Sequence, residues 1–194
     1  MPYCGITALR LVSGIIWVSL ETALDCKKML GSIYHLLFGR HTKALGFVHD
    51  DGGRQAAGFQ GGAGDCVVRA IAIAAERPYL EVYEALRKAN AHYAERSTSR
   101  LAKHLAARGS SPRNGNHRSV FHDYILSLGF EWVPTMAVGQ GCQTHLRHNE
   151  IPAGRLIVKV SKHLSAVIDG VIHDTHNPAR GGTRCVYGYY IQKR

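Results

Sequence analysis

The chain has 194 residues, of which 45% are hydrophobic and 20% are charged. This composition excludes a largely disordered chain, and the length suits one full-sized domain better than two. Lysine and arginine total 24 against 14 aspartate and glutamate, which gives a formal net charge of +10. Such an excess favours contact with polyanions such as nucleic acid, anionic lipid or an acidic protein.

Five cysteines lie far apart along the chain, and no CxxC pair occurs. This pattern argues against a zinc ribbon and against a disulfide framework. We therefore expect reduced thiols in a cytoplasmic protein that needs no metal or other cofactor. The cysteines are Cys4, Cys26, Cys66, Cys142 and Cys185.

Residues 1–45 are predicted to form a helical extension of a domain that comprises residues 46–194. The apolar run Leu11–Leu20 is too short to span a bilayer as a helix. We interpret it as an amphipathic or buried helix. An export signal is the alternative, although no convincing small-x-small cleavage site follows the run. A second helix is indicated by apolar residues at helical spacing, namely Leu30, Ile33, Tyr34 and Leu37.

A stretch rich in glycine and aspartate, residues 49–64, is predicted to be a loop. It leads into a helix that we expect to begin after Asp65 as its N-cap and to end near Glu76. Nearly every residue of this helix is apolar, so the helix should be buried on all sides. Arg69 is the exception and needs a partner or an exit to solvent.

Two further helices are predicted. Pro78 suits the first turn of one that runs to about Tyr93, and the other, residues 119–128, ends at Gly129. Between them the basic region from Arg87 to Arg118 holds eight lysines or arginines and one acid. We interpret this region as a solvated helix end and a mobile loop. The alternative is a surface that contacts phosphates or an acidic partner.

The residues from Phe130 onward favour strands. Asp169-Gly170 is the strongest short hairpin signal in the chain, and it joins residues 163–168 to residues 171–175. Helices that come first and strands that follow are typical of an α+β domain. The other strands are predicted at residues 130–138, 155–160 and 184–191.

Cys66 follows Asp65 in the first turn of the predicted buried helix. The partial positive charge and free N–H groups of a helix start favour a thiolate, which is the reactive form of cysteine. The same N–H groups can bind an oxyanion. Asp65 opposes the thiolate by its charge, so an imidazolium partner is still needed. The alternative is an inert buried cysteine.

The predicted hairpin supplies such a partner. A two-residue loop at Asp169-Gly170 places His163 and Asp174 on one face as diagonal neighbours, roughly 7–8 Å apart. A carboxylate there can hold the imidazole in one tautomer and stabilise its charged form. His176, opposite His163 in the same register, and Asn177 are alternatives for this orienting role.

Gln60 lies six residues before Cys66, in the run Gln-Gly-Gly-Ala-Gly-Asp-Cys. The glycines let the backbone turn tightly and approach a substrate closely. A side-chain amide at this position could donate a second hydrogen bond to an oxyanion.

This run resembles the active-site segment of papain-like cysteine peptidases. In that family a Gln precedes the nucleophilic Cys by the same interval, and the Cys opens a buried central helix. The later run Ser-Lys-His-Leu-Ser-Ala-Val-Ile-Asp-Gly-Val-Ile-His-Asp is similar to the His and Asp strands of bacteriocin-processing peptidase domains and other compact bacterial members. In layout the resemblance covers about residues 55–190. Val67 departs from it, because family members often carry an aromatic residue after the Cys.

The resemblance implies an α+β, papain-like fold, in which N-terminal helices and a buried nucleophile helix pack on a C-terminal antiparallel sheet. It also implies a cysteine-dependent hydrolase, a peptidase or isopeptidase, that acts on a protein or peptide through a thioester intermediate. The matched positions are Cys66 as nucleophile, His163 as base, Asp174 as orienting group and Gln60 in the oxyanion hole.

Two other functions stay open. A non-catalytic module on the same scaffold would bind nucleic acid or an acidic partner through the basic region. A cysteine-dependent acyltransferase would result if an amine, instead of water, resolved the thioester.

Overall fold

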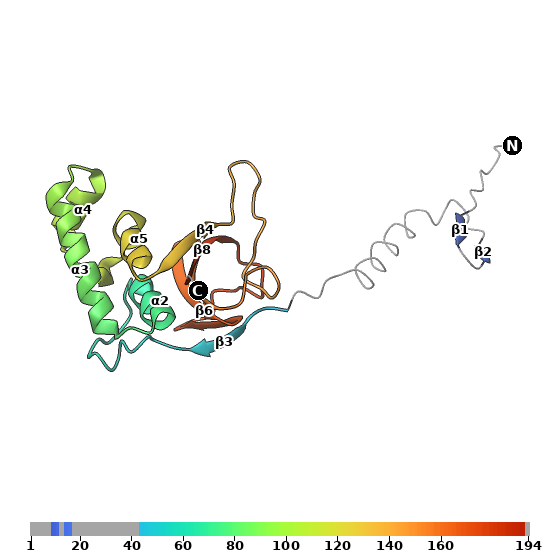
Figure 1. Cartoon of the computed structure of the whole chain (residues 1–194), viewed down its shortest axis with the longest axis horizontal. Coiled ribbons are helices and arrows are strands. Elements are labelled where there is room, and N and C mark those ends of the chain that lie inside the picture. The colour runs from blue at the N-terminus through green and yellow to red at the C-terminus, as the bar shows by residue number, and fades with distance from the viewer. Residues whose placement is uncertain (1–8, 12–13, 17–42, 193–194) are drawn as a thin grey trace. The chain divides into compact units, whose positions relative to one another are not determined.

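The computed structural model describes residues 9–11, 14–16 and 43–192, and the chain forms two compact units, Met1–His41 and Thr42–Arg194. In the first unit Leu9–Leu11 (β1) and Gly14–Ile16 (β2) pair as an antiparallel hairpin (Figure 1). Helix was expected over β2, and this part of the prediction is wrong: glycine and β-branched isoleucines favour turns and strands. The helix predicted over residues 30–37 lies outside the described residues.

Four α-helices are described in the second unit, and three of them confirm the helices expected from the sequence. The fourth, α4, falls in the basic region that was interpreted as a helix end and a mobile loop. Ser99 caps α4 by accepting a hydrogen bond from the N–H of Ala102 at 3.1 Å, and Gly109 follows its last residue. The elements are α2 (Cys66–Ala75), α3 (Tyr79–Arg96), α4 (Arg100–Arg108), the 3-10 turn η2 (Pro112–Asn114) and α5 (Arg118–Ser127).

Six strands of this unit form one mixed sheet in the order β3-β7-β6-β5-β8-β4. The five C-terminal strands are antiparallel, as expected, but β3 pairs in parallel with β7. Parallel pairing needs a long crossover connection, and the helical region together with β4, β5 and β6 supplies it. The strands are β3 (Gly46–His49), β4 (Phe130–Pro134), β5 (Arg155–Val160), β6 (His163–Ile168), β7 (Val171–Asp174) and β8 (Val186–Gln192).

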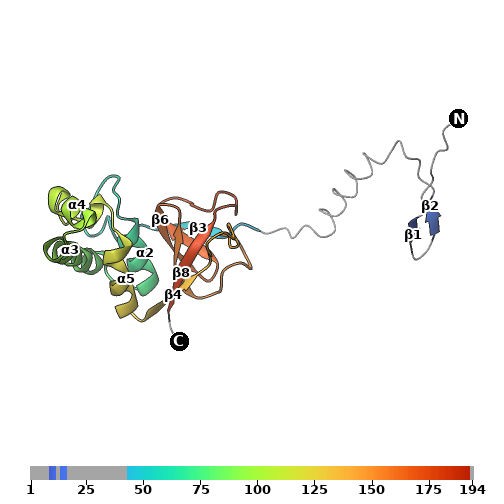
Figure 2. The ribbon, with the colours of Figure 1, turned by 90° about the horizontal axis from the view of Figure 1, so that it is seen from above.

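The central strands β5 and β6 are buried on both faces of the sheet, whereas the edge strand β3 is exposed. Figures 1 and 2 show the helices gathered on one side of the sheet, with α2 between α3 and the sheet. Ile157 on β5 joins the core cluster under the helices, while its neighbours Leu156 and Val158 join a second cluster on the other face. Leu146 and Ala179, from the β4–β5 and β7–β8 connections, complete that second cluster. The helix layer therefore fixes α2 directly against the strands that carry the predicted base.

A disulfide joins Cys142 to Cys185, whose Cα atoms are 5.9 Å apart. The expectation of reduced thiols is wrong for this pair, and the cytoplasmic prediction loses that support. The two residues are 43 positions apart in sequence, but the β4–β5 connection runs back to β8, where His145 bridges Cys185. Among the cysteines that the structure describes, Cys66 is the free thiol. No helix in the described part of the chain is long and apolar enough to cross a bilayer.

Replacing both Cys142 and Cys185 by serine is expected to lower the free energy of unfolding by about 2–4 kcal/mol, because the bridge restricts the unfolded chain. Urea titration under non-reducing conditions measures the loss, and Cys66→Ser is the matched control at a cysteine outside the bridge. Non-reducing peptide mapping that finds both residues as free thiols would contradict the pairing.

Candidate active site

Asp65 stands at the N-cap position of α2, but its side chain makes no capping hydrogen bond. The expected capping role is therefore wrong. The buried carboxylate instead accepts hydrogen bonds from the Arg69 guanidinium, one turn along α2, and from the Tyr79 hydroxyl at 2.7 Å. The negative charge that was expected to oppose a thiolate is thereby compensated.

The first turn of α2 keeps its backbone donors. The first hydrogen bond within the helix runs from the N–H of Arg69 to the carbonyl of Asp65 at 3.1 Å. The N–H groups of Cys66, Val67 and Val68 precede it and have no partner inside the helix. The structure thus places free amides and the helix dipole around the Cys66 sulfur.

His163 begins β6 and Asp174 ends β7, and the two side chains meet. The strands pair in the register expected from a two-residue loop at Asp169-Gly170, with Ala166 opposite His173. His163 Nε2 and Asp174 Oδ2 lie 2.6 Å apart, at hydrogen-bonding distance. The diagonal contact inferred from the hairpin is therefore present in the structure.

The two alternatives for the orienting group do not make this bond. The ring of His176 packs beside that of His163, with the ring centroids 4.7 Å apart. The Asn177 side chain instead accepts a hydrogen bond from the N–H of Ala179 at 2.9 Å.

Cys66 lines the same cavity as His163 and Leu164, and the His163 side chain and the backbone N–H of Leu164 both favour its thiolate form. Since Nε2 of His163 is engaged by Asp174, Nδ1 is the ring nitrogen left for the sulfur. Burial raises the pKa of the Cys66 thiol, but the polar groups of His163 and Leu164 and the charges of His163 and Arg69 outweigh it and hold that pKa below its usual value. The thiol is thus set up to lose its proton.

The electrostatics of the other two groups agree with this. Burial opposes a charged imidazole, but hydrogen bonds to Asp174 and Cys66 raise the pKa of His163 to about 9. Burial also opposes a charged carboxylate, but the hydrogen bond and charge of His163 lower the pKa of Asp174 to about 2. At neutral pH the imidazole is therefore protonated between a carboxylate and an acidified thiol.

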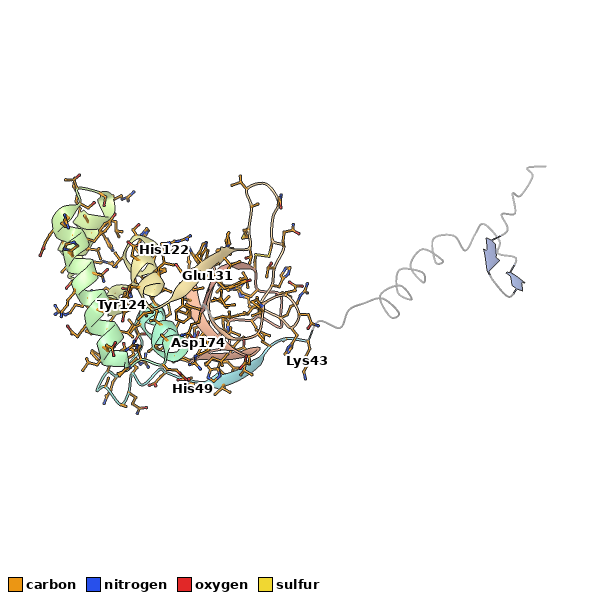
Figure 3. All side chains as sticks on the ribbon, in the orientation of Figure 1. Lys43, His49, His122, Tyr124, Glu131 and Asp174 are labelled. Atoms are coloured by element: carbon orange, nitrogen blue, oxygen red, sulfur yellow. A yellow bond between two sulfur atoms is a disulfide. The ribbon has the colours of Figure 1, made fainter. Side chains whose placement is uncertain are left out.

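Arg69 links the start of α2 to the end of β7. Its side chain is only 6% exposed, and it lies between the carboxylates of Asp65 and Asp174, with Nη2 3.3 Å from Asp174 Oδ1. Figure 3 shows Asp174 beside α2. The sequence predicted that Arg69 needs a partner, and the structure provides two, the carboxylates of Asp65 and Asp174.

A cavity of about 570 Å³ opens onto Cys66 and His163. One wall comes from the segment that leads into α5, and the other from the β5–β6 turn. Gly64 allows the loop before Cys66 to pack closely, since a Cβ there would lie 3.1 Å from the N of Gly115. The remaining lining residues are Val67, Asn116, His117, Arg118, Phe121, Lys159, Val160, Lys162 and Leu164.

Gln60 does not line this cavity. Its backbone carbonyl accepts a hydrogen bond from Arg113 at 2.7 Å, and the same guanidinium lies 5.2 Å over the Phe59 ring. Arg113 thus ties this loop to the segment before α5, and the Gln60 side chain is exposed. The structure does not bring the Gln60 amide to Cys66, and its role in an oxyanion hole stays a prediction.

Lys159 and Lys162, which line the cavity with Arg118 from the end of the basic region, were not expected from the sequence. No motif marks these residues, because they become neighbours only when α5 packs against the sheet. The side chains of His163, Asp174 and His176 also place possible metal-ligand atoms within 4.8 Å of one another. A cation there would compete with the hydrogen bond of His163 to Asp174, so the arrangement suits proton transfer better.

Arg69→Met is expected to lower the free energy of unfolding by about 3–5 kcal/mol, because it removes the buried cation that Asp65 and Asp174 share. Arg77→Met is the matched control: Arg77 also pairs with an acid at i,i+4, Glu81, but the two side chains are 51% and 47% exposed. That exposed pair contributes at most about 1 kcal/mol. Urea titration of both variants compares the losses, and equal losses would contradict the buried link.

Asp174→Asn is expected to lower the pKa of His163 from about 9, because the hydrogen bond and negative charge that raise it are lost. The contribution of His163 to stability is complete below its ordinary pKa of 6.5 and is lost as pH rises through about 9. That of Asp174 is present above 3.8 and is lost as pH falls through about 2. NMR titration of the imidazole protons measures the shift, with Asp169→Asn in the same hairpin as control.

Comparisons of the sequence with protein-family models and with curated proteins, and of the structure with solved structures, found no match. Function is therefore inferred from the side chains at this cavity, their hydrogen bonds and their charges. Cys66 and His163 share this cavity, and His163 is hydrogen-bonded there to Asp174.

Proposed function

We propose that the chain is a cysteine-dependent hydrolase that cleaves peptide or isopeptide bonds through a thioester intermediate. The observation that carries the proposal is that Cys66 shares a cavity with His163, which is itself hydrogen-bonded to Asp174, and that this cavity is large enough for a peptide segment. A nucleophile held by a base, and a base held by a third group, is the arrangement that activates a thiol for acyl transfer. The resemblance of the two sequence motifs to papain-like peptidases agrees with it.

The first half of the reaction forms the thioester. His163 holds the proton of the thiol, and the Cys66 sulfur attacks the acyl carbon of the bound substrate. The free N–H groups at the start of α2 receive the oxyanion that develops on the carbonyl oxygen. The His163 imidazolium then gives its proton to the departing amine, and Asp174 stabilises the imidazolium while it is charged.

The second half consumes a water molecule. His163, now neutral, takes a proton from the water as it attacks the thioester carbon, and returns a proton to the sulfur when the acid product leaves. Acyl transfer to an amine would use the same first half and differ only in the acceptor.

The nucleic-acid-binding alternative has less support from the described basic region. Arg87 pairs with Glu84, Arg113 holds the loop at Gln60, and Arg118 packs on Trp132, so part of its charge has a structural use. Exposed cations on α4 remain for such a partner. A flat dependence of nucleic-acid affinity on salt would eliminate this alternative, because phosphate neutralisation must release counterions.

The proposal is tested by the rate at which iodoacetamide alkylates Cys66 at pH 7, with the adduct located by peptide mapping. His163→Ala is expected to lower this rate by about tenfold or more, because an unassisted thiol is only a few per cent ionised at that pH. His176→Ala is the matched control, since it removes a neighbouring histidine that is not bonded to Asp174. Labelling that spares Cys66, or that is equally fast in His163→Ala, would overturn the proposal.

A second readout follows the reaction itself. Incubation of the chain with a peptide mixture should yield a Cys66 thioester that hydroxylamine releases, and Cys66→Ala should yield none.

A further inference from the structure

The cavity at Cys66 is lined by cationic side chains. Arg118 at the start of α5 lies on one wall, and Lys159 and Lys162 near the β5–β6 turn lie on the other. Among the described residues that line the cavity, none is acidic. A carbonyl substrate bound there would therefore meet a strongly positive surface close to the reacting sulfur.

Packing holds Arg118 in place. Its guanidinium lies over the Trp132 ring, 4.3 Å from the centroid. The indole fits against β8 only because position 188 is glycine, since a Cβ on Gly188 would overlap the Trp132 ring. The cation is thus pre-positioned by an aromatic ring and loses little freedom when it binds an anion.

Lys159 faces Arg118 from the opposite wall. The pairing of β5 with β8 shifts register between Lys159 and Val160, and both residues line the cavity. Partial burial and the nearby charge of Arg118 both lower the pKa of Lys159. An anion bound between these two positive charges would stabilise the charged form of both side chains.

Lys162 adds a third positive charge immediately before His163. Its backbone is left-handed, with φ of 58°, in the tight turn between β5 and β6. No salt bridge between described residues includes Lys159 or Lys162. Both lysines are therefore available to bind an anion that enters the cavity.

We propose that this cavity selects acidic peptides, with a substrate carboxylate near the scissile bond lying between Arg118 and Lys159. The inference rests on the proposed function, because it takes Cys66 as the attacking group. An acidic peptide is favoured over a polynucleotide because the cations and the thiol line the same cavity, and only the peptide offers an acyl carbon to that thiol.

Two small alkylating agents test the charge preference without a known substrate. Iodoacetate and iodoacetamide deliver the same carbon to a thiol, but only iodoacetate is an anion. The ratio of their rate constants at Cys66 is expected to exceed that of an unstructured cysteine peptide by about fivefold, and to fall toward it at high salt. A ratio equal to that of the peptide would overturn the inference.

Variants assign the preference to residues. Lys159→Gln is expected to lower the rate ratio several-fold, and Arg118→Gln likewise, with thermal unfolding checked because Arg118 also packs on Trp132. Lys103→Gln on α4 makes the same change in net charge outside the cavity and should leave the ratio as in the wild type. A ratio unchanged in both Lys159→Gln and Arg118→Gln would overturn the inference.

Paired substrates and competitors extend the test. Peptides that differ only by Glu or Gln beside the scissile bond should differ in kcat/KM, with Glu preferred and the preference reduced in Lys159→Gln. Poly-glutamate should slow alkylation of Cys66 by iodoacetamide. Slowing by a short oligodeoxythymidylate and not by poly-glutamate would overturn the choice of an acidic peptide.

Failure of this inference is distinguishable from failure of the proposed function. If Cys66 reacts in a His163-dependent manner but ignores the charge of the reagent, the substrate class is wrong and the hydrolase proposal stands. If Cys66 reacts with neither reagent, the hydrolase proposal itself is overturned.

Discussion

A single buried cation between two buried carboxylates is the interaction on which the candidate site depends. Arg69 forms an ion pair with one carboxylate oxygen of Asp174, and the N–H of Thr175 donates a hydrogen bond to the same oxygen at 2.7 Å. The other oxygen is thereby left for His163 at 2.6 Å. The guanidinium thus joins α2 to β7 and also sets the direction from which the carboxylate meets the imidazole. Its partners would be costly to bury alone, so the link also couples the geometry of the site to the stability of the domain.

The same network resolves a conflict at the start of α2. An aspartate beside a reactive cysteine would suppress the thiolate if its charge were free. The Asp65 carboxylate accepts hydrogen bonds from Arg69 and Tyr79, and the Arg69 cation compensates its charge. The side chain therefore does not bond to the backbone amides that a capping aspartate would satisfy. The helix loses the stabilisation of a cap and keeps donors for a substrate oxygen. Local stability is exchanged here for chemical capacity, as is common at functional sites.

Local signals predicted the elements that form the candidate site. The Asp169-Gly170 turn fixed the register of its hairpin, and the all-round apolar pattern of residues 67–75 identified a buried helix with one cation in need of a partner. Signals that exist only in three dimensions could not be found in this way. The Cys142–Cys185 disulfide depends on the path of the long β4–β5 connection. The strand β3 has only four residues and is followed by a glycine-rich loop, so its sequence pattern is weak. The cationic residues that line the cavity come from segments that meet only after folding.

The parallel pairing of β3 with β7 has a consequence for biosynthesis. β3 leaves the ribosome early, yet its hydrogen-bonding edge is completed by a strand that emerges more than a hundred residues later, and the N–H of Asp50 then binds the carbonyl of Asp174 at 3.0 Å. Pairing over such a separation is slow and must await the synthesis of β7. A nascent chain that has not reached β6 therefore carries the Cys66 thiol without its imidazole, and nucleophilic reactivity would arise only after β6 and β7 have joined the sheet.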